Sequence, residues 1–196
     1  MKHQHPTSLQ PRGFTLIEML VVIGIIAILA TIAVPAGQAV LRKARELQAK
    51  AQMQGVVLAV KAYQTEYSRL PATESPPPTE DNTEGYDTSS EDGKGIIAVL
   101  TGKNTTLNPR TIPFYEPPAA KKGGGGYSEA DGLVDIWGKN GYTIVLDYDG
   151  DGQITSPYSD GDDAKVSSSV IIYCAGQDKK LDVGSSTKSD DLKSWE

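Results

Sequence analysis

An uncharged stretch near the N-terminus constrains the fold of this chain more than any other feature. Residues 19–41 contain no Asp, Glu, Lys or Arg over 23 consecutive positions. A helix needs about 20 predominantly apolar residues to cross the hydrocarbon core of a bilayer. The stretch therefore predicts a membrane-spanning helix, and the remaining residues, which are polar and rich in Gly, Pro, Ser and Asp, must form an attached head.

This apolar segment has three interpretations: a secretory signal peptide, an ordinary anchor, or a helix with a more specific role. A signal peptide has an apolar region of about 7 to 15 residues that ends in small residues at a cleavage site. Here the apolar region is longer and continues into helix-forming sequence, so we expect it to be retained. Four basic residues follow the span within residues 42–50, and a charge count alone would place the head in the cytoplasm.

Glu18 lies at the start of the apolar stretch. An ionised carboxylate within a spanning helix costs on the order of a few kcal/mol and normally has a partner. Cleavage between Gly13 and Phe14 would create an amine one helical turn away, where it could neutralise Glu18 of the same chain or of a neighbouring subunit. The alternative is a tolerated charge at the cytoplasmic end of a simple anchor.

The residues around Glu18 resemble the class III leader and N-terminus of type IV pilins and type II secretion pseudopilins. The matching run is Arg12-Gly13-Phe14-Thr15-Leu16-Ile17-Glu18-Met19-Leu20-Val21-Val22-Ile23. The resemblance implies a leader over residues 1–13, cleavage after Gly13 by a prepilin peptidase, methylation of the Phe14 amine, and registration of subunits by Glu18. Pro35 matches a proline that these helices share.

Helical periodicity continues beyond the apolar stretch to the dipeptide Leu70-Pro71, which should end the helix. We expect residues 14–41 to be the transmembrane and assembly half and residues 42–70 to be an amphipathic half. Because Pro35 lacks an amide hydrogen, it should kink or locally melt the helix near Gly37. The predicted apolar stripe comprises Val40, Ala44, Leu47, Ala51, Met53, Val56, Val60, Tyr63 and Tyr67.

The head, residues 71–196, changes in composition along its length. Residues 71–131 are rich in Pro, Gly and Ser and predict a variable loop with little core. An apolar island at 95–100 interrupts it and could be a short helix or strand packed on the head. The acidic region 132–196 contains strand-like apolar runs. These runs are residues 142–146 and 166–174, with a possible third around 153–155.

The predicted fold class is therefore α+β. The chain should have the pilin-like fold, a long N-terminal α-helix packed on a small C-terminal antiparallel β-sheet with long loops. Cys174 lies in an apolar run and is interpreted as a packed strand residue rather than a reactive thiol. A single cysteine cannot form an intrachain disulfide.

Three short motifs near the C-terminus resemble the major pseudopilin of type II secretion. They are Asp135-Ile136-Trp137-Gly138, Tyr173-Cys174-Ala175-Gly176-Gln177-Asp178 and Asp190-Asp191-Leu192-Lys193-Ser194-Trp195. In that family the C-terminal loop folds around Ca²⁺. By position, the resemblance implies carboxylate ligands Asp178, Asp190 and Asp191, with the main-chain carbonyls of Ala175 and Val183. Solvated tail charges are the alternative.

A second acidic segment has the spacing of the first half of a calcium loop. Asp147, Asp149 and Asp151 alternate along the chain and are followed by glycines, so their carboxylates could face one centre. Tyr158 stands at the twelfth position, where a bidentate Glu would be expected. The alternative is a Gly/Asp turn between two strands without metal.

Charge and residue types narrow the function. A net charge of -6 and a pI of about 5.0 argue against nucleic acid as a partner. His3 and His5 fall in the predicted leader and no catalytic arrangement is evident, so no enzyme is expected.

The resemblance implies a subunit of a type II secretion pseudopilus for protein export. It also implies a single-pass protein of the bacterial inner membrane, with the head in the periplasm or outside the cell, assembled into a filament. The implied partners are further copies, other pseudopilins, the prepilin peptidase and an inner-membrane assembly platform. Two alternatives are a major or minor type IV pilin for adhesion, motility or DNA uptake, and a membrane-anchored calcium-dependent binding module.

Overall fold

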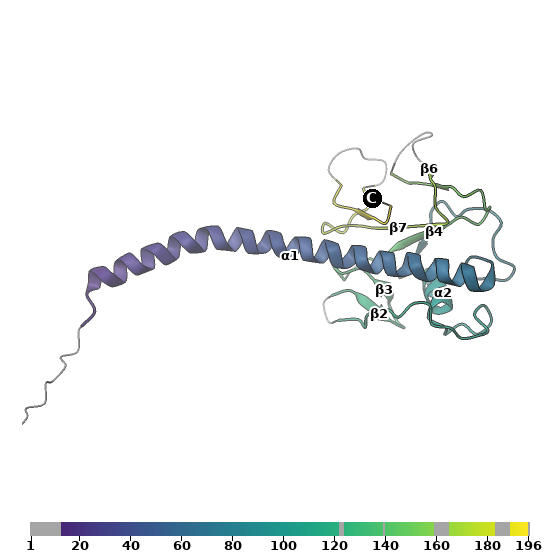
Figure 1. The fold of residues 1–196 in the computed structure, drawn as a ribbon, viewed down its shortest axis with the longest axis horizontal. Helices are drawn as coiled ribbons and strands as arrows, with labels where there is room; N and C mark the ends of the chain where they lie inside the picture. The colour runs from purple at the N-terminus through teal and green to yellow at the C-terminus, as the bar shows by residue number, and fades with distance from the viewer. Residues whose placement is uncertain (1–12, 122–123, 139, 159–164, 183–188, 196) are drawn as a thin grey trace, which may run out of the picture. The chain divides into compact units, whose positions relative to one another are not determined.

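The computed structural model describes residues 13–121, 124–138, 140–158, 165–182 and 189–195 (Figure 1). The chain divides into two compact units, residues 1–43 and residues 44–196, the second of which we call the head unit. The elements of the chain, in order, are one long helix, a short strand, a second helix and a series of short strands.

Helix α1 runs from Leu16 to Tyr67 over 52 residues and contains Pro35. The chain is helical throughout this range, so the predicted local melting near Gly37 does not occur. Proline removes only one amide donor, and the hydrogen bonds of the turns on either side remain.

The head-unit part of α1 buries one apolar face. Seven residues are buried there: Ala49, Met53, Val56, Val57, Ala59, Val60 and Tyr63. Their spacing of three and four residues confirms the second half of the predicted stripe. The first half of the stripe is helical but does not belong to this buried face, because Leu47 is 59% exposed. Leu47 and Met53 are six residues apart, which places them about 120° apart around the helix.

A four-stranded antiparallel sheet lies against this face in the order β1-β4-β7-β8. The central pair is β4 (Thr143–Leu146) and β7 (Val170–Cys174), in which Thr143 pairs with Tyr173 and Leu146 with Val170. The edges are β1 (Tyr86–Asp87) and β8 (Leu192–Lys193). This helix-on-sheet arrangement confirms the predicted α+β fold class.

Two further strand pairs flank the sheet. They are β2 (Gly126–Ser128) with β3 (Gly132–Val134), and β5 (Ile154–Thr155) with β6 (Lys165–Val166). The predicted strand over residues 166–174 was therefore wrong as one element, because the chain leaves β6 after Val166 and begins β7 at Val170. The expected third strand is present as β5.

Both faces of the central strands are covered. Ile144, Leu146 and Ile172 belong to the core that includes α1, whereas Val145, Ile171 and Tyr173 belong to a second cluster with Ile154 of β5. Successive side chains of a strand point to opposite faces, so both positions of the alternation are apolar here. Cys174 is buried, and burial raises the pKa of its thiol to about 12, as expected for a packed strand residue.

The segment 71–131 contributes more core than its composition predicts. The apolar island forms helix α2 (Glu91–Leu100), whose Ser90 side chain caps the N-terminus by accepting from the amide of Gly93. Its buried residues are Gly93, Ile96, Ile97, Val99 and Leu100. The expectation of a loop with little core was wrong because loop composition does not reveal which side chains are held inside.

Asn108 holds the chain that follows α2. Its side chain is fully buried and donates to the carbonyls of Val99 at 2.9 Å and Ile112 at 2.8 Å. Its oxygen accepts from the amide of Ile112 and from the hydroxyl of Tyr67. One amide group thus connects the end of α1 with the loop beyond α2.

We expect Asn108→Ala to lower the free energy of unfolding by about 3 kcal/mol, because it leaves buried carbonyls without donors. Urea denaturation of the full chain in detergent, followed by tryptophan fluorescence, measures the change. Asn104→Ala is the matched control, because the Asn104 side chain accepts from two amides of its own turn, those of Thr106 and Leu107. Equal losses in the two variants would contradict this role for Asn108.

Candidate functional site

The N-terminal candidate site begins where α1 begins. The Glu18 carboxylate accepts from the Thr15 amide at 2.8 Å and from the Thr15 hydroxyl at 2.6 Å. In return, the Glu18 amide donates to the Thr15 hydroxyl at 3.3 Å. This reciprocal pattern is a capping box, in which the N-cap and the third helical residue satisfy each other's free amides. The Thr-x-x-Glu spacing in the sequence could have indicated it.

Gly13 and Phe14 are exposed and precede the first helical turn. Phe14 is 73% exposed and lines a hollow of about 350 Å³ along the start of the helix, together with Ile17, Glu18, Val21 and Val22. A backbone bond outside the helix is accessible to a peptidase, and the carboxylate lies one turn from the amine that cleavage would create. The structure therefore brings the predicted processing and assembly residues, except Pro35, into one short segment.

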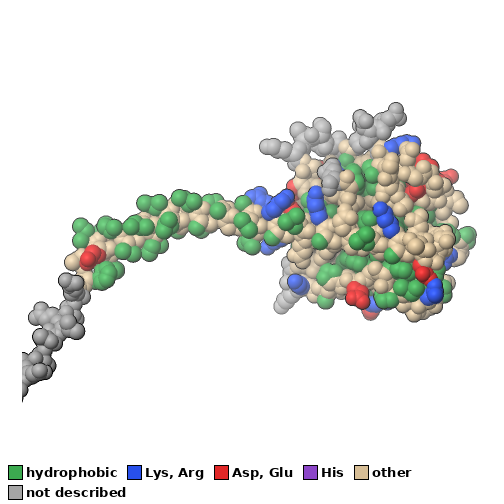
Figure 2. Space-filling model, viewed as in Figure 1, with side chains coloured by type: hydrophobic (Ala, Val, Ile, Leu, Met, Phe, Trp, Pro, Cys, Tyr) green, Lys and Arg blue, Asp and Glu red, His purple; other side chains and the backbone are tan. Residues whose placement is uncertain are grey.

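The apolar part of α1 is long and apolar enough to cross a membrane, and none of it is buried within the chain. Figure 2 shows hydrophobic side chains covering this part of the helix. The most exposed large apolar residues include Leu16, Ile17, Leu20, Ile23, Ile28 and Ile32, each at least 62% exposed. A continuous apolar surface of this size requires lipid or other protein surfaces around it.

The C-terminal candidate site lies between β7 and β8. Oxygens of Asp178, Asp182 and Asp190 all lie within 4.8 Å of one another. The Asp190 carboxylate accepts from the amides of Gln177 at 2.6 Å and Asp178 at 3.1 Å, which joins the two ends of the connection. Asp182 was not predicted, although its place in the same acidic loop could have indicated it.

The other predicted ligands of this site are Asp191, Ala175 and Val183. Asp191 is buried, and its carboxylate accepts from the Asp182 amide at 2.8 Å instead of joining the three clustered carboxylates. Ala175 is buried at the end of β7. Val183 lies outside the described residues.

The second acidic segment forms a tight turn between β4 and β5. Asp147 accepts from the amides of Gly150 and Gly152, at 2.9 and 3.0 Å, and burial raises the pKa of its carboxyl group. Its metal-competent neighbours are Asp149 and Asp81, with oxygens within 4.8 Å, whereas Asp151 is outside this group and accepts from the Gln153 amide. Asp81 was missed because it comes from a distant loop.

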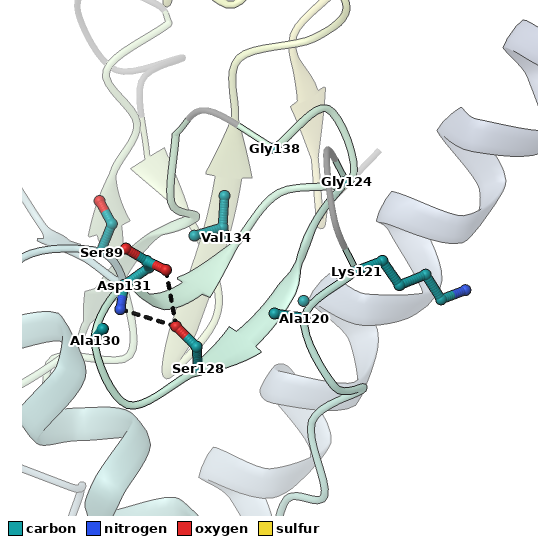
Figure 3. A pocket seen from close by; sticks show the side chains of 10 residues that line it. Ser89, Ala120, Lys121, Gly124, Ser128, Ala130, Asp131, Val134 and Gly138 are labelled. Carbon is teal, nitrogen blue, oxygen red and sulfur yellow. Dashed lines mark hydrogen bonds between the residues drawn. The ribbon is translucent and has the colours of Figure 1, made fainter.

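A cavity of about 470 Å³ lies beside the β2–β3 hairpin (Figure 3). Ser128 donates to the Asp131 carboxylate at 2.9 Å, so these two polar side chains satisfy each other. Figure 3 shows the Lys121 side chain pointing away from the cavity. The described lining is otherwise mostly small residues and glycines, which gives this cavity little chemistry of its own.

Comparison with known proteins gives a match to one family and to one curated protein. Residues 10–34 match the family described as the prokaryotic N-terminal methylation motif. A segment of 33 residues is 73% identical to Prepilin peptidase-dependent protein D of Escherichia coli (strain K12), covering 17% of this chain and 23% of that protein. No solved structure was found to match. The motif, the local identity and the fold together support the type IV pilin-like superfamily.

Gly176 is required at the C-terminal site by a close backbone approach. A Cβ atom at this position would lie 2.0 Å from the Asp190 carbonyl oxygen. We therefore expect Gly176→Ala to push β7 and the Asp190 segment apart and to lower the melting temperature by about 5 °C or more. Gly124→Ala, whose nearest contact would be 3.8 Å, is the control and should melt close to the parent chain. Thermal melts followed by circular dichroism measure both, and an unchanged Gly176→Ala variant would contradict this packing.

Proposed function

We propose that the chain is a structural subunit of a type II secretion pseudopilus, which polymerises through α1 to support protein export. The observation that carries this proposal is the exposed apolar half of α1 with Glu18 at its start. That surface suits a bilayer before assembly and the core of a filament afterwards. The head contributes the C-terminal motifs that resemble the major pseudopilin.

Processing follows from the same segment. A prepilin peptidase would cut after Gly13, and methylation of Phe14 would follow; the dependence on prepilin peptidase in the name of the Escherichia coli relative supports this assignment. Before assembly the chain would be a single-pass protein of the inner membrane, with the head in the periplasm. Cleavage would also leave the mature chain without its two histidines, His3 and His5, which supports a structural rather than a catalytic role.

Two variants separate processing from assembly in a host that expresses a prepilin peptidase. Gly13→Leu should block cleavage, which the mass of the chain reports. Glu18→Leu should be cleaved normally but enter filaments about tenfold less, the effect of losing a contact of ~1.4 kcal/mol. Glu18→Asp is the control that keeps the charge. Filaments of Glu18→Leu at the parental level would contradict assembly through this carboxylate.

A type IV pilus subunit is the second candidate, because the matched N-terminal segment does not distinguish it from a pseudopilin. Deleting the gene in its own bacterium separates the two. Loss of exported proteins from the medium supports the pseudopilus. Intact export with loss of adhesion, motility or DNA uptake would replace that proposal with a pilus.

Calcium binding by the head is the second part of the proposal. Three clustered carboxylates offer the oxygen ligands that Ca²⁺ prefers. A loop-rich tail buries little apolar area, so a metal that binds only the folded state would stabilise it. The group of Asp178, Asp182 and Asp190 is the first candidate, and the group of Asp81, Asp147 and Asp149 is the second.

Calcium at 100 times its dissociation constant should raise the free energy of unfolding by about 2.7 kcal/mol. Asp182→Asn should abolish the effect if the C-terminal group binds, whereas the matched variant Asp149→Asn should retain it. Calorimetric titration and thermal melts measure both. The opposite pattern would move the site to the β4–β5 turn, and no binding would exclude both calcium sites and a calcium-dependent binding module.

A further inference from the structure

A second cavity of about 360 Å³ lies at one end of the head unit. It is lined by Arg45, Gly124, Ile136, Trp137, Gln177 and Lys179. This described lining combines two cations, an amide and an indole ring, and contains no carboxylate. The size falls within the range of small-molecule sites, and the lining chemistry suits an anion attached to an apolar group.

Three separate parts of the chain position these groups. Arg45 lies on α1, Trp137 follows β3, and Lys179 follows β7. The Trp137 turn is closed by a bond of 2.9 Å from the Gly138 amide to the Asp135 carbonyl, and the ring packs partly against the main core. Lys179 has a φ of 65°, and its carbonyl accepts from the Asn140 side chain at 3.1 Å.

The neighbouring acidic residues are not among those that line the cavity. Asp178 accepts from the Lys180 amide at 2.8 Å and belongs to the group with Asp182 and Asp190. Asp135 is fully buried beneath the Trp137 turn. Glu46, next to Arg45, is half-buried. The described lining of the cavity therefore carries two positive charges and no negative one.

The position of Arg45 along the chain indicates the source of the anion. It follows the last residue of the uncharged stretch, Leu41, by four positions, or about 6 Å of helix. The headgroup region extends roughly 5 to 8 Å beyond the hydrocarbon core on each side of a bilayer. Lys and Arg side chains gather on α1 directly after the apolar stretch (Figure 2). Tryptophan is also enriched at this depth.

We propose that this cavity binds the phosphate of an anionic phospholipid while the subunit is in the membrane. Arg45 offers a fork of donors, Lys179 adds a point charge, and Trp137 covers the glycerol end of the headgroup. The positive-inside rule alone would place the basic residues within 42–50 in the cytoplasm. Binding of an anionic lipid would give these residues a role on the opposite side of the membrane. The proposal rests on membrane insertion of α1 and not on the pseudopilus assignment.

The test uses the full chain in zwitterionic detergent, with Trp195→Phe so that Trp137 is the only remaining tryptophan. Short-chain phosphatidylglycerol should change Trp137 emission saturably, with a half-saturation about fivefold lower than that of phosphatidylcholine with the same acyl chains. The double variant Arg45→Gln/Lys179→Gln should lose this preference. Lys61→Gln, an exposed cation about 24 Å further along α1, should retain it.

Three results would overturn the proposal. Equal half-saturation for the two lipids would remove the role of charge, and an unchanged preference in the double variant would remove the site. Inorganic phosphate that reproduces and competes with the lipid response would assign the cavity to free phosphate instead. Circular dichroism checks the fold of each variant, and flotation with phosphatidylcholine vesicles checks insertion independently of lipid preference.

Discussion

The burial of α1 against the four-stranded sheet is the interaction on which the head unit depends. Met53, Val60 and Tyr63 are each at most 1% exposed and share one core with the inner faces of β4 and β7. The Tyr63 hydroxyl donates to the Leu107 carbonyl at 2.7 Å, and the Tyr142 hydroxyl bonds the Gln52 side chain. Because these two hydroxyls are bonded inside, the rings of Tyr63 and Tyr142 fill the core without leaving their own polar groups unpaired.

The outer face of the sheet explains why the C-terminal residues matter to the candidate metal site. The rings of Tyr158, Tyr173 and Trp195 contact one another there, with centroids 5.4 to 6.4 Å apart. Ser194 accepts from the Gln54 side chain on α1 and bonds the main chain of Ile172. These contacts hold β8 in register, so the carboxylates before it meet those that follow β7. The motif at residues 190–195 therefore packs β8 against the sheet, and this packing in turn positions the acidic loop.

A single helix meets two different environments in this chain. Its head-unit part has one buried face and one solvent-exposed face. Its first part is apolar all round, as a membrane span or a filament core requires. The Thr15–Glu18 capping box satisfies the carboxylate within the uncleaved chain. After cleavage the new amine at Phe14 would compete for the same carboxylate. Arg45 and Trp137 line one cavity of the head unit, where charge and aromatic surface come together.

The sequence by itself determined the features that arise from neighbouring residues. The uncharged stretch, the motif around Glu18, the Met53 to Tyr63 stripe and the runs that became β4 and β7 are all local patterns of charge or period. Helix and strand periods report which face is apolar without knowledge of the partner. The capping box is equally local, because the Thr-x-x-Glu spacing of Thr15 and Glu18 is visible in the sequence.

Only the tertiary structure decided which distant residues meet. The Asp81 carboxylate accepts from the Tyr148 amide, 67 residues away, and Asp182 joins Asp178 and Asp190 across the β7–β8 connection. The choice of helix over strand for α2, the break between β6 and β7, and the cavity lined by Arg45, Trp137 and Lys179 were also not evident in the sequence. Each of these results from the packing of separate segments on one core, and such packing has no periodic signature along the chain.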